Sequence, residues 1–144
     1  MKSRNFWKLL LTLVIMLTVL TGCFLDKTFT YSFRQDRSNI EKVEICAFDY
    51  YNGKEITPIT QMRGESVDIL LAELSALKCY LVTPFDPTIT FGDKVICITY
   101  LNEEVEVIGK YNVGWISDDG KWHYSRYCFE SRGINAIIER YAKY

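Results

Sequence analysis

Residues 94–124, KVICITYLNEEVEVIGKYNVGWISDDGKWHY, decide the fold of this 144-residue chain. Residues 94–101 are apolar on both faces, which predicts a strand at the centre of a sheet. Residues 104–108 then alternate acidic and apolar side chains, so Glu104 and Glu106 are expected to point outward from the next strand. Turn residues separate the strands, and the stretch therefore predicts an antiparallel meander.

The second half of this stretch is rich in aromatic residues. Two further strands are predicted, over residues 111–116 and 121–129, and Asp119-Gly120 between them favours a tight hairpin. Trp and Tyr are enriched at binding hot spots, so we identify a candidate binding surface on this hairpin. Its residues are Tyr111, Trp115, Trp122 and Tyr124. We expect Trp115 and Trp122, which flank the turn, to be able to pair across it. Packing within the sheet is the alternative, because aromatic residues favour strands in any case.

Upstream of the meander, the pattern predicts strands with weaker signals. Residues 29–33 alternate aromatic and polar side chains, and residues 40–51 alternate as well, so we expect these two strands to form a hairpin. Residues 56–64 do not continue as a clear strand. A short strand is expected near residues 80–82.

Two helices complete the prediction. Residues 65–77 place apolar side chains at helical spacing, and residues 134–141 do the same after a plausible N-cap, Ser131. The sum is an α+β domain over residues 29–144: a mainly antiparallel sheet of about five or six strands with two amphipathic helices on one face. The expected core residues are Val43, Ile45, Leu70, Leu74, Ile96, Ile98, Ile137 and Ile138.

The N-terminus has the pattern of an export signal. Residues 1–8 carry three basic residues and no acidic one, and residues 9–21 are uncharged. A bilayer-spanning helix needs about 20 apolar residues, so this run is short for a transmembrane segment. A basic start followed by a short apolar run is typical of a secretory signal peptide.

The run ends at Leu20-Thr21-Gly22-Cys23, which resembles the lipobox of bacterial lipoproteins. The resemblance implies cleavage before Cys23 and a diacylglyceryl group on the sulfur of that cysteine. Residues 1–22 would then be the signal peptide, and residues 23–28 a lipidated tether. Two acyl chains suffice for stable anchoring. The expected location is therefore the cell membrane, on its extracytoplasmic side, with the membrane itself as a partner through the lipid on Cys23.

The rest of the chain is similar to small lipoproteins of low-GC Gram-positive bacteria. The similarity lies in Asn39-Ile40 before Val43-Glu44-Ile45 and in residues 108–124, IGKYNVGWISDDGKWHY. Such proteins have no assigned activity, so the resemblance implies an exported domain and assigns no catalytic or binding residue.

Composition and charge exclude several classes of protein. Hydrophobic residues make up 49% of the chain, which excludes a disordered chain. Of the 17 Lys and Arg, three precede Cys23, so the rest of the chain carries 14 against 18 Asp and Glu, a net charge of −4. This balance argues against a nucleic-acid partner.

Motifs of common catalytic, nucleotide and metal sites are absent from the sequence. The only histidine, His123, is interpreted as a sheet residue without a placed catalytic partner. We therefore predict no catalytic residue, no metal site and no cofactor.

Four cysteines follow Cys23: Cys46, Cys79, Cys97 and Cys128. In an exported chain they permit two disulfides in any of three connectivities, or they are buried thiols that pack as small apolar side chains. Their apolar neighbours favour burial, and both alternatives stay open.

These observations favour a non-enzymatic binding module on the membrane surface. The alternative is an inhibitor or immunity-type lipoprotein that neutralises a secreted enzyme or toxin, because an acidic domain suits a basic target. A small hydrolase or thiol enzyme is the third interpretation, and the missing site constellation makes it the weakest.

Overall fold

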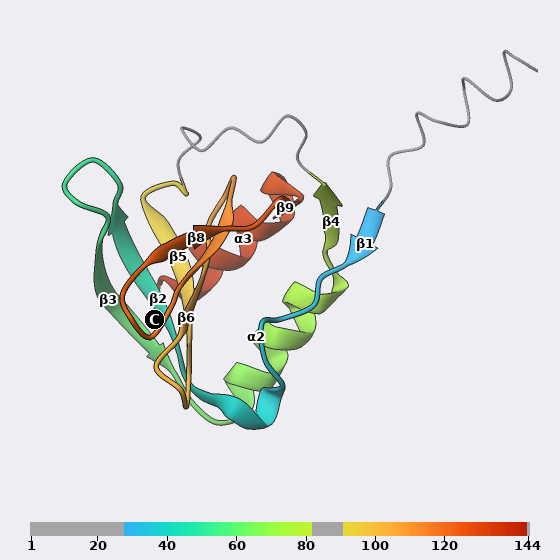
Figure 1. The fold of residues 1–144 in the computed structure, drawn as a ribbon. Coiled ribbons are helices and arrows are strands. Elements are labelled where there is room, and N and C mark those ends of the chain that lie inside the picture. The colour runs from blue at the N-terminus through green and yellow to red at the C-terminus, as the bar shows by residue number, and fades with distance from the viewer. Residues whose placement is uncertain (1–27, 82–90, 144) are drawn as a thin grey trace, which may run out of the picture.

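The computed structural model describes residues 28–81 and 91–143 of the chain (Figure 1). The elements in chain order are β1 (Thr28–Thr30), the 3-10 helix η1 (Arg37–Asn39), β2 (Ile40–Asp49), β3 (Glu55–Met62), α2 (Glu65–Ala76), β4 (Lys78–Leu81), β5 (Lys94–Tyr100), β6 (Val105–Ile108), β7 (Val113–Ile116), β8 (Trp122–Tyr124), β9 (Tyr127–Phe129) and α3 (Ser131–Tyr141). The predicted α+β class and both predicted helices are confirmed.

The strands form two sheets instead of the single sheet that was expected. The larger one has six strands in the order β3-β2-β5-β6-β7-β8, and the smaller one has three in the order β1-β4-β9. Every neighbouring pair is antiparallel. The meander prediction is confirmed for β5, β6, β7 and β8, which are neighbours in the same order as in the sequence.

Two hydrophobic clusters form the core of the described residues. The first joins both helices to the larger sheet through the leucines of α2, the isoleucines of α3 and the isoleucines of β5. It contains all eight expected core residues. The second, which we call the aromatic cluster, is built on Cys46, Phe48, Phe91, Val95, Cys97 and Val107, with Trp122 and Tyr124 packed against it.

Burial of both faces of the sheet overturns one prediction on β6. Glu106 was expected to point outward, but it is 0% exposed. The expectation rested on the alternation of acidic and apolar residues in this strand, which is typical of a strand with one face exposed to solvent. Val107, its neighbour, is buried in the aromatic cluster instead.

Strand β3 was missed in the sequence because it contains Pro58. Proline lacks the N–H that a ladder requires, and it is therefore tolerated in edge strands and at bulges. β3 is such an edge strand, and its register with β2 shifts by one residue, so that Thr60 faces Ile45 whereas Pro58 faces Cys46.

The predicted hairpin between residues 29–33 and 40–51 is wrong. β1 pairs with β4, and β2 pairs with β3 and β5. Alternation identifies a segment as a strand but does not select its neighbour, because the backbone N–H and C=O groups of one strand can pair with those of any other strand.

The predicted strand over residues 121–129 is divided between the sheets. β8 pairs with β7 in the larger sheet, and β9 pairs with β4 in the smaller one. At the crossing, the N–H of Ser125 donates to the carbonyl of Val113 at 2.8 Å, and the N–H of Tyr127 donates to Ser125 Oγ at 3.0 Å. These bonds turn the chain from one sheet into the other.

The predicted signal peptide, residues 1–22, and the predicted lipidation site, Cys23, lie outside the described residues. Within residues 28–81 and 91–143, no helix has the length and apolar character needed to cross a bilayer.

Candidate functional site

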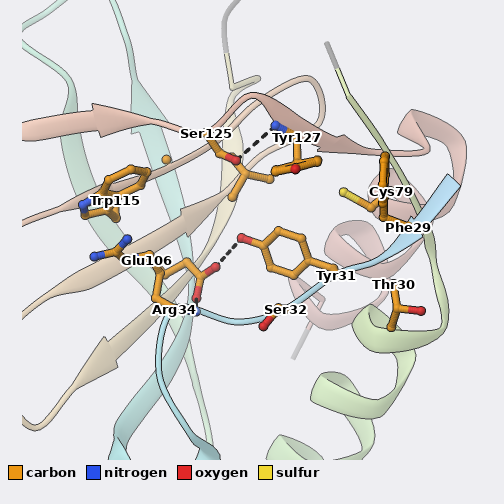
Figure 2. A pocket seen from close by; sticks show the side chains of 12 residues that line it. Phe29, Thr30, Tyr31, Ser32, Arg34, Cys79, Glu106, Trp115, Ser125 and Tyr127 are labelled. Carbon is orange, nitrogen blue, oxygen red and sulfur yellow. Dashed lines mark hydrogen bonds between the residues drawn. The ribbon is translucent and has the colours of Figure 1, made fainter. Parts of the chain in front are cut away.

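The candidate functional site is a pocket between the two sheets (Figure 2). Its volume is about 370 Å³, which lies in the range of roughly 300–1,000 Å³ for small-ligand pockets. Trp115 and Arg34 lie at one end, and Phe29 and Tyr127 at the other (Figure 2). Both sheets supply walls, and Ser125, where the chain passes from one sheet to the other, also lines the pocket.

A buried carboxylate lies between the two ends of the pocket. Glu106 Oε1 accepts a hydrogen bond from the Tyr31 hydroxyl, and Oε2 accepts one from the Tyr100 hydroxyl. Oε2 also accepts the backbone N–H of Arg34 at 3.2 Å. These three donors compensate for burial, because an uncompensated buried carboxylate would be costly.

Burial changes the acid–base properties of this group. Desolvation raises the pKa of Glu106, although the hydrogen bonds from both tyrosines act in the opposite direction. Burial, and then the negative charge of Glu106, raise the pKa of Tyr31 and of Tyr100 far above its usual range. Both tyrosines therefore remain protonated donors at physiological pH.

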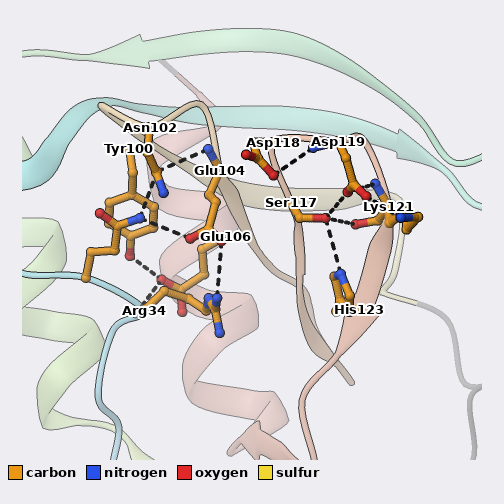
Figure 3. Close-up of polar contacts among 11 residues, drawn as sticks. Arg34, Tyr100, Asn102, Glu104, Glu106, Ser117, Asp118, Asp119, Lys121 and His123 are labelled. Carbon is orange, nitrogen blue, oxygen red and sulfur yellow. Dashed lines mark hydrogen bonds and ion pairs between the residues drawn. The ribbon is translucent and has the colours of Figure 1, made fainter.

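The chain segment that covers the pocket is fastened to the start of β6 (Figure 3). Gln35 Nε2 donates to Asn102 Oδ1 at 2.7 Å and to Glu104 Oε2 at 3.0 Å. Arg34 Nη2 lies 3.4 Å from Glu104 Oε1. These contacts hold the segment over residues 31–35 against the larger sheet and so set the position of the pocket wall.

Three planar groups stack at one end of the pocket. The Arg34 guanidinium lies over the Trp115 ring, with its Cζ 4.1 Å from the ring centroid. The other neighbour of Trp115 is His123, whose ring is stacked at 5.0 Å between centroids and 11° between planes. A cation above an aromatic face is attracted by the ring quadrupole, so Arg34 is held as a charged group at the pocket wall.

The structure separates the four residues of the predicted binding surface. Trp115 lines the pocket, whereas Trp122 and Tyr124 pack on the aromatic cluster. Tyr111 is exposed, and the Lys110 ammonium lies 5.0 Å from its ring centroid. Trp115 and Trp122 do not form a cross-strand pair, because Trp115 faces His123 and Trp122 faces Ile116. Side chains that are neighbours along a strand point to opposite faces.

Trp122 and Tyr124 contact a basic residue of the β2–β3 turn. Lys54 Nζ donates to the Tyr124 hydroxyl at 2.6 Å and lies 5.5 Å from the Trp122 ring centroid. Trp122 also packs on Phe48 and Phe91, with centroids 5.6 and 5.7 Å apart. These contacts give the two residues a packing role, which is the alternative considered for the predicted surface.

Ser117 of the β7–β8 turn also contacts His123 of β8 (Figure 3). Ser117 Oγ lies 3.2 Å from His123 Nε2 and 2.5 Å from Asp119 Oδ1, and it also lies 3.2 Å from the Lys121 carbonyl. Asp119 Oδ1 is the nearest of these groups and only accepts, so the single hydroxyl proton is assigned to it, and His123 Nε2 is then assigned as the donor to Ser117. A general base must instead accept the proton of the nucleophile, so this arrangement braces the turn without activating the hydroxyl.

The described cysteines are all thiols, of which Cys46, Cys79 and Cys97 are buried and Cys128 is partly exposed. Cys79 contributes to the pocket wall. Among residues 28–81 and 91–143, no group of three or more His, Cys, Asp or Glu side chains is arranged to hold a metal ion.

The pocket residues other than Trp115 were not identified from the sequence. Glu106 lies 75 residues after Tyr31 and 72 residues after Arg34 along the chain, so the sequence pattern does not bring them together. The one available signal was the acidic residue between two valines in 105–107, which suggested a solvated face. The comparisons with known proteins add no further assignment, since no family model, curated protein or solved structure matches this chain.

Proposed function

We propose that this chain is a membrane-anchored, extracytoplasmic binding protein without catalytic activity, and that its ligand binds in the pocket between the two sheets. The observation that carries the proposal is the pocket itself, which combines aromatic walls with a few directed polar groups. Such a combination is typical of ligand sites, where apolar walls provide affinity and polar groups provide orientation.

The lining indicates the chemistry of the ligand. Phe29, Trp115 and Tyr127 present ring surfaces, which favour an apolar or planar group. Arg34, Ser32 and Ser125 also line the pocket. Arg34 Nη2 contacts Glu104 and Ser125 Oγ accepts the Tyr127 N–H, and a guanidinium with five N–H groups and a hydroxyl each have a further proton to donate to a ligand. The ligand class is therefore a small molecule or a peptide side chain that has a planar apolar part and a hydrogen-bond acceptor.

The position of β1 supports the link between anchoring and binding. Thr28 begins β1 and follows Cys23 by five residues. A chain extends by at most about 3.6 Å per residue, so this segment reaches roughly 18 Å. A lipid on Cys23 would consequently hold β1, and Phe29 at the pocket, near the membrane surface.

A non-catalytic role is supported by the groups around the pocket. Its carboxylate, Glu106, accepts hydrogen bonds from three donors, which engage both of its oxygens. The nearest serine–histidine pair, Ser117 and His123, has its hydroxyl proton directed to acceptors. Neither group is arranged as an activated nucleophile.

Photo-crosslinking in native membranes tests the proposal. The photoreactive residue benzoylphenylalanine replaces Phe29, which is 39% exposed in the pocket, or Tyr111, which is 43% exposed outside it. After irradiation, intact-mass spectrometry of the purified chain measures the adduct. We expect an adduct of defined mass with the label at Phe29 and none at Tyr111, because the two positions are matched in exposure but only one faces the pocket.

A second variant tests whether the adduct forms in this pocket. Tyr127→Ala removes one ring from the pocket wall at a partly exposed position, so we expect a lower adduct yield with an unchanged circular dichroism spectrum. The adduct mass also distinguishes a small ligand from a protein partner. Equal adduct at Phe29 and Tyr111, or no adduct at either, would contradict the proposal.

A further inference from the structure

Two of the four described cysteines meet on the same face of the larger sheet. In the pairing of β2 with β5, Cys46 lies opposite Val95 and Glu44 lies opposite Cys97. Opposite residues point to one face, and so do residues two apart in a strand. Cys46 and Cys97 are therefore diagonal neighbours, and both belong to the aromatic cluster.

The remaining cysteines are close in register but point apart. In the pairing of β4 with β9, Cys79 lies opposite Phe129 and Tyr80 lies opposite Cys128. Adjacent residues in a strand point to opposite faces, so the side chains of Cys79 and Cys128 leave the smaller sheet on different sides. Side chains that point apart cannot be bridged without movement of the backbone.

From these placements we infer that Cys46 and Cys97 form a disulfide when the folded protein meets a disulfide-bearing oxidant, while Cys79 and Cys128 remain thiols. The inference goes beyond the proposed function and does not depend on the pocket or on the anchor. It selects one pairing for Cys46 and Cys97 where the sequence left all connectivities open.

The chemistry assigns a different role to each sulfur. A hydrogen bond from the Cys97 thiol lowers the pKa of Cys46, and the same contact together with burial raises the pKa of Cys97. The Cys46 thiolate attacks one sulfur of the oxidant and expels the other as a thiolate. Cys97 then attacks the Cys46 sulfur and expels the second oxidant thiol. The two cysteines lose two electrons and two protons, and the oxidant disulfide is reduced to two thiols.

The strand pairing around Cys46 permits the approach that a bridge requires. Diagonal neighbours are about 7–8 Å apart at their backbones, which is at or just above the limit of roughly 7 Å for a disulfide, so the bridge requires a small movement of one strand. On its other side Cys46 faces Pro58, which has no N–H to donate, and an extra residue of β3, Ile59, lies beside this position. β2 is thus held less firmly there, and the strained bridge should also be reduced readily.

Access of the oxidant requires a local opening. Cys46 is 1% exposed and Cys97 is 2% exposed. The edge strand β3 covers one side of β2, and edge segments open more readily than central ones. Oxidation is therefore expected to be slow compared with that of an exposed thiol.

The experiment uses the full chain in detergent, incubated with oxidised glutathione under native conditions. Free thiols are then alkylated in denaturant, and the protein is digested without reduction for peptide mapping by mass spectrometry. We expect one peptide pair linked through Cys46 and Cys97, lighter by two hydrogen atoms than the sum of its parts, with alkylated Cys79 and Cys128. Reduced glutathione should reverse the link in the folded protein.

Matched variants complete the test. Cys97→Ala should abolish the linked pair, whereas Cys128→Ala should retain it, and circular dichroism checks that both variants are folded. Wild-type mapping decides the question even if a variant fails to fold. A link that includes Cys79 or Cys128, alkylation of both Cys46 and Cys97 after native oxidation, or a link that reduced glutathione cannot reverse would overturn the inference.

Discussion

Glu106 connects three separate parts of the chain. It lies on β6, accepts the Tyr100 hydroxyl from β5, and accepts the Tyr31 hydroxyl and the Arg34 N–H from the segment before η1. Hydrogen bonds to a charged group contribute about 1.5–3 kcal/mol each. This residue therefore positions the segment that forms one wall of the pocket.

The raised pKa of Glu106 predicts a specific dependence of stability on pH. Above the ordinary value of 4.5, the folded protein binds more protons at this site than the unfolded protein does. The contribution of Glu106 to the free energy of unfolding is thus complete below the ordinary pKa, and it decreases as the pH rises through the raised pKa. In urea denaturation at several pH values, the unfolding free energy of Glu106→Gln minus that of the wild type should increase as pH rises.

Glu104→Gln is the matched control, because Glu104 lies directly before β6 and two residues from Glu106. A hydrogen bond from Gln35, and then the charge of Arg34, lower the pKa of Glu104. A lowered pKa contributes stability that is lost as pH falls, so the corresponding difference should decrease as pH rises. The same pH trend in both variants would show that Glu106 is not desolvated in the folded protein.

At the scale of elements, helix α2 has one buried side and one exposed side, and this division can be recognised from its own sequence. Leu70, Leu71 and Leu74 are buried in the first hydrophobic cluster, and Ile69 is 48% exposed. Acidic residues in its first turn, Glu65 and Asp68, interact favourably with the helix dipole. The apolar spacing alone therefore located this helix.

The helix predicts a contrast between two adjacent residues. Leu70→Ala should lower the free energy of unfolding by about 2–5 kcal/mol, because a buried leucine leaves a cavity. Ile69→Ala, one residue away and exposed, should change it by no more than about 0.5 kcal/mol. Urea denaturation measures both, and equal losses would mean that the buried face of α2 is assigned incorrectly.

Strands behave differently from helices. The periods of residues 29–33 and 121–129 indicated strands. Only residues 29 and 30 of the first segment lie in a strand, β1, which pairs with β4, and residues 121–129 divide between two sheets. A helix completes its hydrogen bonds within one segment, whereas a strand completes them with a partner that any distance in sequence can separate. Local pattern therefore predicted strand positions better than strand neighbours.

At the scale of the whole molecule, the proposed anchor lies close in sequence to one wall of the pocket. β1 follows Cys23 by five residues, and Phe29 on β1 lines the pocket. Because the lipid is expected on the Cys23 sulfur, Cys23→Ala should abolish incorporation of a fatty-acid probe in metabolic labelling. An unprocessed precursor should accumulate or be released.

Cys128→Ala is the control for this labelling, since it removes a thiol from the folded domain and leaves Cys23 in place. It should incorporate the probe as the wild type does. Equal incorporation of the probe in the wild type and in Cys23→Ala would contradict the anchoring proposal. The pocket proposal is tested separately, by the crosslinking experiment.

The sequence by itself determined the features that depend on neighbours along the chain. These are the α+β class, both helices, the meander from β5 to β8 and the expected core residues, all of which the structure confirms. Each rests on a period or a turn within about 30 residues, where side-chain spacing directly reflects backbone geometry.

Only the tertiary structure decided which surfaces meet. It divided the strands between two sheets, buried Glu106 against Tyr31 and Tyr100, and placed Trp115 in the pocket while Trp122 packs in the aromatic cluster. The physical reason is that an alternating pattern specifies two faces of a strand but not what covers either face. The pattern of a carboxylate between two valines predicts a solvated side chain. Tyr100 is only six residues away from Glu106, but Tyr31 and Arg34 reach it only in the folded chain.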